Sequence, residues 1–176
     1  MHDKNRFPEA ALTLHVQSFF HASTSTWTYV VADSGTKVGA IIDPVLDFDS
    51  ASGRIWHESA LKLLDHVRMH ALRIDWILET HAHADHLSAA GWLKDTLAQH
   101  GNAPQIGIGA GIVAVQGHFA NVFALGDEFS ADGAQFDYLF ADGERFEIGS
   151  LVVEIIATPG HTPDSISYQI DDTLFV

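Results

Sequence analysis

The sequence predicts an α/β domain in which helices form a layer over a sheet. Runs rich in β-branched and aromatic residues lie near both ends of the chain, and two stretches between them carry apolar residues at helical spacing. Hydrophobic residues make up 47% of the 176 positions and charged residues 18%. Because a chain of this length buries roughly 70% of the surface that it exposes when unfolded, residues 1–176 are expected to form one domain.

The first part of the chain predicts antiparallel strands followed by a helix. Residues 12–20, 26–32 and 38–42 are the strands, with turn residues at 33–35. Asp43-Pro44 ends the third strand, and the stretch with Asp47, Asp49 and Gly53 is expected to be a loop. Residues 57–70 carry Leu61, Leu64 and Val67 at helical spacing, which predicts a helix that covers the sheet.

The remaining elements follow from the same patterns. Residues 74–80 are a short apolar strand, and residues 87–100 form a helix with Gly101 at its C′ position. The Gly-rich stretches 107–117 and 126–143 are expected to be loops with one short strand each. Residues 146–148, 151–157, 165–170 and 173–176 read as strands, the last two joined by a hairpin turn at 171–172. This order indicates a layered α/β domain rather than an all-parallel, doubly wound sheet.

Four side chains that can bind metals fall within six positions after a predicted strand: His81, His83, Asp85 and His86. Imidazole nitrogens and carboxylate oxygens suit zinc, iron or manganese. In an extended loop, His81 and His83 turn toward one centre, while Asp85 and His86 can face another. The loop therefore predicts a metal site with room for two adjacent ions.

A fifth candidate ligand, His161, lies in the turn Thr158-Pro159-Gly160-His161-Thr162. Pro and Gly end a strand here, and the hydroxyls of Thr158 and Thr162 are expected to orient the imidazole. Asp85 has an alternative role, as N-cap of a helix that starts near His86. The other histidines are expected to be surface or packing residues: His2, His15, His21, His57, His66, His70, His100 and His118.

Charge and composition narrow the function. The chain contains nine Lys and Arg and 23 Asp and Glu. The resulting formal charge of −14 disfavours nucleic acid or an anionic membrane as a partner. Without cysteine, any metal must use His and carboxylate ligands. Residues 1–6 lack the apolar run of a signal peptide and no 18 apolar residues follow one another, so we expect a cytoplasmic protein.

Residues 80–87 (THAHADHL) resemble the HxHxDH signature of the metallo-β-lactamase superfamily, and residues 159–162 (PGHT) resemble its next ligand motif. Similarity extends through residues 16–20, 40–47 and 77–80. These matches look most like the persulfide dioxygenase branch and the bacterial β-lactamase hydrolase-like proteins, with glyoxalase II a more distant relative.

The resemblance implies an αββα sandwich of which this chain holds the N-terminal part. In two-metal members, His81, His83 and His161 would hold the first ion, and Asp85 and His86 the second. In persulfide dioxygenases, one iron would be held by His81, His161 and a later Asp. The family continues the strand at 174–176 into a Gly-Asp that supplies this Asp. Residues 1–176 alone are therefore expected to aggregate, to pair with another chain as in a homo-oligomer, or to bind metal weakly.

Three functions follow as hypotheses. The first is an Fe(II) enzyme that oxidises a glutathione persulfide-type, thiol-derived small molecule with dioxygen. The second is a glyoxalase II-like thioester hydrolase with two Zn ions, in which Asp85 is both a ligand and the catalytic residue that orients the nucleophile. The third is a non-catalytic metal-binding module. The resemblance does not favour β-lactamase activity itself.

Overall fold

The computed structural model describes residues 14–126 and 128–176. Positions 12 and 13 of the predicted first strand lie outside the described residues. No helix in the described part of the chain is long and apolar enough to cross a membrane.

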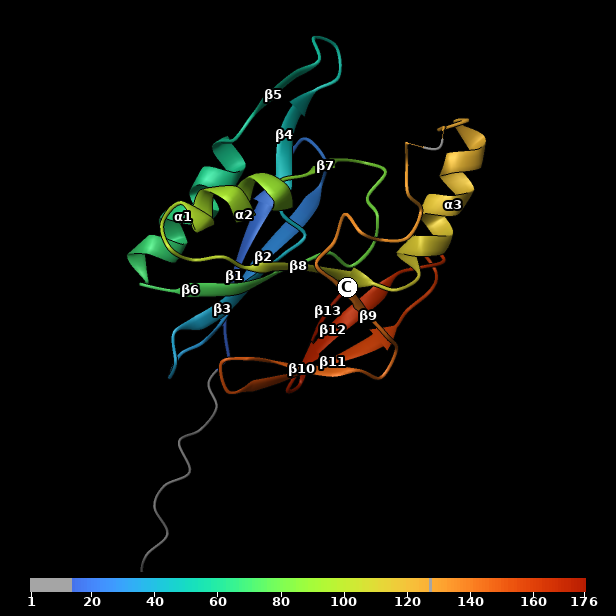
Figure 1. Cartoon of the computed structure of the whole chain (residues 1–176). Coiled ribbons are helices and arrows are strands. Elements are labelled where there is room, and N and C mark those ends of the chain that lie inside the picture. The colour runs from blue at the N-terminus through green and yellow to red at the C-terminus, as the bar shows by residue number, and fades with distance from the viewer. Residues whose placement is uncertain (1–13, 127) are drawn as a thin grey trace, which may run out of the picture.

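A six-stranded sheet forms the centre of the molecule (Figure 1), in the order β1-β2-β3-β6-β8-β9. Its first three strands are antiparallel and the remaining neighbours are parallel, so the prediction of an antiparallel edge is confirmed. The strands are β1 (Leu14–His21), β2 (Thr26–Asp33), β3 (Val38–Ile42), β6 (Arg73–Leu78), β8 (Gln105–Gly109) and β9 (Tyr138–Phe140).

Two helices cover one face of this sheet, as Figure 1 shows: α1 (Glu58–Met69) and α2 (Ala90–Ala98). Leu63, Leu64 and Leu93 of the helices pack against Ile41 and Ile77 of the sheet, and all five are buried. The predicted helix at 57–70 is confirmed. Removal of this apolar surface from water holds the helical layer in place.

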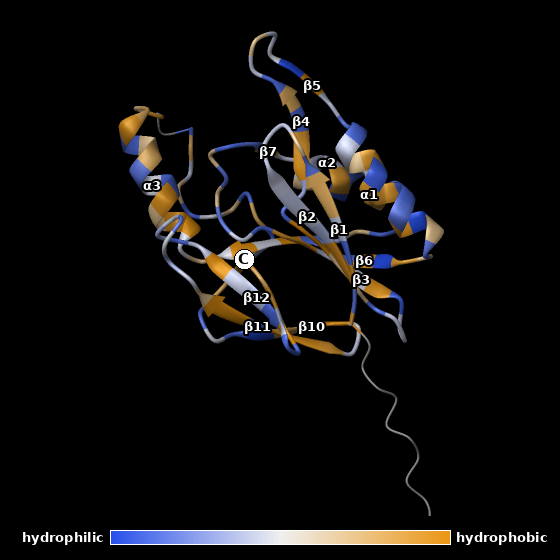
Figure 2. Cartoon of the chain, turned by 180° about the vertical axis from the view of Figure 1, so that it is seen from behind, coloured by the Kyte–Doolittle hydropathy of each residue, from blue (hydrophilic) through white to orange (hydrophobic). Residues whose placement is uncertain are grey.

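A second sheet packs on the opposite face, in the order β10-β11-β12-β13. Its strands, which match the predicted hairpin series, are β10 (Arg145–Ile148), β11 (Leu151–Ala157), β12 (Ile166–Ile170) and β13 (Thr173–Phe175). The core between the sheets includes Val31, Ile42, Phe140, Val153 and Tyr168. The result is a helix, sheet, sheet layering. In Figures 1 and 2 no helix of the described residues lies over the outer face of the second sheet.

The predicted loop around residues 43–53 is wrong. Residues 45–56 form a hairpin of β4 (Val45–Asp49) and β5 (Arg54–Trp56), and β4 also pairs with β7 (Leu87–Ser88). The buried face of β4 carries Val45 and the polar Asp47, whereas Phe48 is exposed, so the hairpin lacks the apolar-in, polar-out alternation by which strands are predicted.

The helix predicted to start near His86 starts later, at Ala90, because residues 87–88 pair with β4. Ala89 is its N-cap, so the capping role considered for Asp85 is wrong. Gly101 takes a φ of +80° in the turn after the helix, as its predicted position requires.

In the stretch 107–117, the predicted short strand is confirmed, but most of the predicted loop is a helix. Residues 105–109 form β8 and helix α3 (Ile112–Val122) follows. Gly107 permits a close approach, since a Cβ there would lie 2.5 Å from the Phe140 ring. Only Ile112 of α3 is buried, and its other apolar residues form the orange helix at the edge of the molecule in Figure 2. A helix that buries so little of its surface lacks the periodicity by which helices are predicted.

Asp33 ties the two sheets together at the end of β2. Its buried carboxylate accepts hydrogen bonds from Gly35 N at 2.8 Å, Thr36 Oγ1 at 2.7 Å, Ser150 N at 2.8 Å and Ser150 Oγ at 2.7 Å. Gly149 beside it has a φ of +65°, and a Cβ there would lie 2.2 Å from Thr36 Oγ1. The hydrogen bonds from Ser150 above all hold the pKa of Asp33 well below its usual range.

Replacing Asp33 with alanine is expected to lower the free energy of unfolding by about 2–4 kcal/mol, because several buried donors lose their acceptor. Since the pKa is lowered on folding, this stabilisation is present above the unfolded value of 3.8 and is lost as pH falls below it. Urea unfolding at pH 7 and near pH 3 measures both effects. Asp49→Ala is the matched control, since Asp49 accepts from Ala51 N and Ser52 Oγ in an exposed turn. Equal losses in the two variants would contradict the prediction.

Candidate metal centre

The histidine-rich loop, residues 79–89, begins at the carboxyl end of β6. β3 and β6 are parallel neighbours, so Asp43, which follows β3, lies at the same edge of the sheet. The turn that carries His161 precedes β12, and Ile166 N donates to Thr80 O at 3.0 Å. Open α/β sheets bind ligands at such edges. The fold thus brings three separate segments to one place.

His81 is oriented through Thr80. Thr80 Oγ1 donates to Asp43 Oδ2 at 2.9 Å, so the same oxygen accepts from His81 Nδ1, which is 2.9 Å away. The other ring nitrogen, His81 Nε2, is buried without a hydrogen-bond partner among residues 14–126 and 128–176. Burial, together with the charge of His83, lowers the pKa of His81. The ring therefore offers a free electron pair, which is what a metal ligand requires.

His83 is held from the opposite side by two carboxylates. Its Nε2 lies 3.1 Å from Asp43 Oδ1 and 3.4 Å from Glu79 Oε2, and both acidic side chains are buried. Burial of the ring disfavours its charged form, but the hydrogen bonds to Asp43 and Glu79 outweigh burial and raise the pKa of His83 to about 10. Burial above all raises the pKa of Glu79, to about 7. The metal-free site therefore keeps a proton on His83 Nε2, and its Nδ1 faces Asp85 Oδ1 at 4.0 Å.

His86 and Asp85 complete one cluster. His86 Nδ1 donates to Leu87 O at 3.1 Å, and its buried Nε2 has no partner in the described part of the chain. Asp85 is half exposed and accepts from Thr26 Oγ1 at 3.4 Å. Ligand atoms of His83, Asp85 and His86 all lie within 4.8 Å of one another. Two imidazoles and a carboxylate at this spacing are a donor set that a divalent transition metal could occupy.

His161 reaches the loop from the second sheet. Its ring lies 4.9 Å from that of His81, centroid to centroid, in a T-shaped arrangement. Within the described residues, neither His81 nor His161 belongs to a group of three ligand atoms that lie within 4.8 Å of one another. The hydroxyls expected to orient His161 are engaged elsewhere: Thr158 Oγ1 contacts Ser167 Oγ at 2.8 Å and Thr162 Oγ1 contacts Ser165 Oγ at 2.7 Å.

Two hollows flank the loop. One, of about 430 Å³, lies between the loop and α3, and its walls are mostly apolar apart from His118, His161 and the buried Asp164. The other, of about 380 Å³, is bordered by His81, His83 and His86. Cavities of this size bind small molecules. Between them, the two hollows border His81, His83, His86 and His161.

Sequence reasoning assigned Asp43, Glu79 and Thr80 no role in the metal site, although they position the candidate ligands. All three follow apolar strands, in the segments Ile41-Ile42-Asp43 and Leu78-Glu79-Thr80. Acidic residues at the carboxyl ends of neighbouring parallel strands could have indicated a shared site. Their buried oxygens support the donor atoms from behind, as outer-shell carboxylates do in metal proteins.

Comparison with known proteins places this site in a family. A family model described as the metallo-beta-lactamase superfamily matches residues 23–176. The chain is 45% identical over 168 residues to the beta-lactamase hydrolase-like protein of Xylella fastidiosa (strain 9a5c), a match that covers 96% of this chain and 38% of the relative. It is 43% identical over 162 residues to Glyoxylase B2 of Dictyostelium discoideum, which covers 92% of this chain and 54% of that one.

More distant matches include a solved structure. Persulfide dioxygenase ETHE1, mitochondrial, of Bos taurus is 26% identical over 157 residues, with 89% of this chain and 48% of the relative covered. ETHE1 from Myxococcus xanthus superposes with a TM-score of 0.65 at 26% identity and covers 91% of this chain and 55% of that chain. The chain thus spans about half, or less, of the length of these relatives.

Proposed function

Because the chain belongs to the metallo-beta-lactamase superfamily, we propose that its histidine-rich loop serves an iron-dependent enzyme that oxidises a thiol-derived small molecule of the glutathione persulfide type with dioxygen. Fe(II) is the expected cofactor. The likeness to persulfide dioxygenases and to the ETHE1 structure supports the substrate class. We keep the cytoplasm as the proposed compartment and a homo-oligomer as the proposed assembly.

The observation that carries this proposal is the position of His83 between two buried carboxylates. Asp43 and Glu79 both contact Nε2, so the ring is stabilised as a cation, and a cation is a poor metal ligand. His81 and His161 have no such carboxylate contact within the described structure, and their rings are neighbours. They would be the two imidazoles of a two-His, one-carboxylate set, which leaves coordination positions open.

The chain's own residues have defined tasks in this proposal. Thr80 accepts a hydrogen bond from His81 Nδ1, so the proton is held on Nδ1 and Nε2 is left free as the ligand atom. His83 would act from outside the ligand set as a charged hydrogen-bond donor, and the hollow between the loop and α3 would hold the apolar part of the substrate. When bound, iron supplies the redox chemistry by which dioxygen oxidises sulfur.

A second candidate is supported by a different observation. Ligand atoms of His83, Asp85 and His86 lie within 4.8 Å of one another, so a ligand expected at the first position adjoins the two expected at the second, and the match to Glyoxylase B2 is closer in sequence than that to ETHE1. In this case His83 would lose a proton and coordinate through Nδ1, and Asp85 would orient the nucleophile of a thioester hydrolase with two Zn ions. True β-lactamase activity is not proposed.

His83→Ala separates the two candidates. In the iron enzyme, the purified full-length variant should keep close to one iron per chain while oxygen uptake with glutathione persulfide falls about 10–100-fold, the usual cost of losing an outer-shell partner. In the dinuclear hydrolase, the variant should lose zinc from the first position, and hydrolysis of a glutathione thioester should fall with it. Elemental analysis after loading with each metal measures the first effect, and the two assays measure the second.

His100→Ala is the control, because His100 is an exposed histidine just after α2 whose ring bonds only Thr96 O of that helix within the described residues. It should match wild type in every measurement. Retained metal without turnover of either substrate would favour the third hypothesis, a metal-binding module. Iron loss in His83→Ala equal to that in His81→Ala would contradict the mononuclear assignment.

A further inference from the structure

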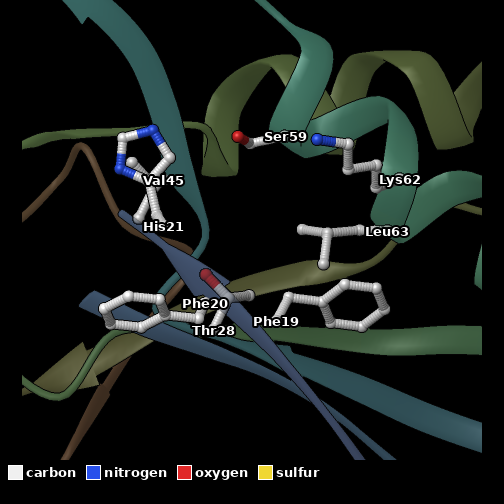
Figure 3. Close-up of a pocket in the computed structure, with 8 residues that line it drawn as sticks. All are labelled: Phe19, Phe20, His21, Thr28, Val45, Ser59, Lys62 and Leu63. Carbon is white, nitrogen blue, oxygen red and sulfur yellow. The ribbon is translucent and has the colours of Figure 1, made fainter. Parts of the chain in front are cut away.

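A second group of histidines lies in the seam between β1 and α1. Side chains at alternate positions of β1, including His15 and Phe19, face this helix. Figure 3 shows one end of the seam, where Phe19 and Leu63 border a cavity of about 90 Å³ that also reaches His21 and Lys62. Toward the other end, α1 contributes His66 and His70, which are four residues apart and therefore on one face of the helix. They meet His15 of β1.

The three rings are close neighbours. The centroids of His66 and His70 are 4.1 Å apart, those of His15 and His70 5.9 Å, and those of His15 and His66 6.0 Å. Imidazoles on one tetrahedral ion have centroids roughly 5 Å apart, given metal–nitrogen bonds of about 2 Å. The rings of the histidine-rich loop show similar separations, 4.1 Å for His81 and His83.

In this group, one ring nitrogen of His70 is hydrogen-bonded, while Nε2 of both His66 and His70 remains available to bind a metal. His70 Nδ1 donates to His66 O at 3.0 Å, which leaves Nε2 of an exposed ring free to act as a ligand. His66 is buried, 8% exposed, and its Nε2 has no hydrogen-bond partner within the described ranges. A buried polar atom without a partner is unfavourable, and a bound ion would give it one.

We propose that His15, His66 and His70 form a second transition-metal site, for Zn²⁺ or a similar ion that prefers imidazole, independent of the histidine-rich loop. The three ligand nitrogens are not yet within 4.8 Å of one another in the described structure, so His15 and His70 must rotate to close the site. Both side chains are exposed, and rotation of the His70 ring requires its hydrogen bond to His66 O to open. None of these three histidines belongs to the groups of ligand atoms in the histidine-rich loop, so the two metal sites can be separated by mutation.

The test uses a full-length protein whose loop donors are removed by His81→Ala, His83→Ala and His86→Ala. Zinc titration of this background, by calorimetry or competition with a chromophoric chelator, should show one bound ion per chain. Adding His70→Gln should weaken zinc binding at least tenfold, and adding His15→Gln should do the same. Both residues are exposed, so neither change threatens folding, and circular dichroism checks that each variant stays folded.

His100→Gln is the matched control in the same background. His100 resembles His70, since its Nδ1 lies 2.9 Å from Thr96 O, four residues earlier, but no aromatic or imidazole ring packs against it in the described part of the chain. It should leave zinc affinity unchanged. A background protein that binds no zinc at 1 mM would overturn the proposal, and so would equal affinities in the His70→Gln and His100→Gln variants. Neither result depends on the reaction proposed for the main site.

Discussion

Replacing Asp43 with alanine is expected to lower the free energy of unfolding by about 3 kcal/mol and to weaken metal binding about 10–100-fold. The carboxylate accepts from Thr80 N at 2.8 Å, Thr80 Oγ1 at 2.9 Å and His83 Nε2 at 3.1 Å. Its loss leaves the buried amide of Thr80 without an acceptor. It also removes the hydrogen bonds that orient His83 directly and His81 through Thr80. Urea unfolding of the metal-free protein measures the first effect, and competition with a chelator measures the second.

Part of this stabilisation depends on pH. The pKa of His83 is raised on folding, from 6.5 to about 10, by hydrogen bonds that outweigh burial. The ion pair therefore contributes fully below pH 6.5 and is lost as pH rises through about 10. The difference in unfolding free energy between wild type and Asp43→Ala should accordingly shrink in the metal-free protein between these values.

The chain contains a close match for Asp43 as a control. Asp47 is equally buried and accepts from Ser59 N at 2.8 Å and Ser59 Oγ at 2.7 Å, with His21 Nε2 at 3.3 Å. Asp47→Ala should cost a similar free energy of unfolding but leave metal affinity unchanged. If both variants lost metal equally, general destabilisation would account for the result and the positioning role of Asp43 would be wrong.

Replacing His81 with alanine is expected to lower metal affinity by at least about 100-fold. Removing a direct ligand should weaken metal binding at least as much as removing an outer-shell partner does. The free energy of unfolding of the metal-free protein should fall by only about 1 kcal/mol, since the hydrogen bond from Nδ1 to Thr80 Oγ1 is lost and Nε2 has no partner to lose in the described structure. His161→Ala should have the same effect on metal. Metal content by elemental analysis and urea unfolding without metal give the two readouts.

His118→Ala serves as the comparison for His81→Ala. His118 borders the same hollow as His161 but belongs to α3 and lies outside the histidine-rich loop. Its replacement should leave metal content at the wild-type level. A His81→Ala protein that retained wild-type metal content would refute the site assignment.

Much of the sheet could be predicted because its strands carry their own pattern. β3 spans Val38–Ile42 as expected, and the β12–β13 turn lies at residues 171–172 as expected. The candidate ligands were visible because four of them are adjacent in sequence. Segments with few buried residues were harder: α3 buries only Ile112, so tertiary context rather than periodicity makes it a helix.

The supporting residues could not be predicted from spacing. Asp43 and His83 are 40 positions apart and meet only because β3 and β6 are parallel neighbours. The start of α2 was misplaced for a similar reason, since residues 87–88 form backbone bonds with β4, an element that sequence reasoning took for a loop. Pairings between distant segments depend on the whole fold, whereas helix and strand patterns are local.

The hydrogen bond from Ile166 N to Thr80 O joins two segments that are far apart along the chain. His81 and His161 therefore become neighbours only after the two sheets have docked, so an unfolded chain offers an ion no comparable set of ligands. Mass action then links metal supply to the stability of the native state: at an ion concentration 100 times the dissociation constant, folding gains about 2.7 kcal/mol. In a cell depleted of the metal, this contribution to stability would be lost. A larger fraction of the protein would then be unfolded and exposed to proteolysis, in addition to any loss of activity.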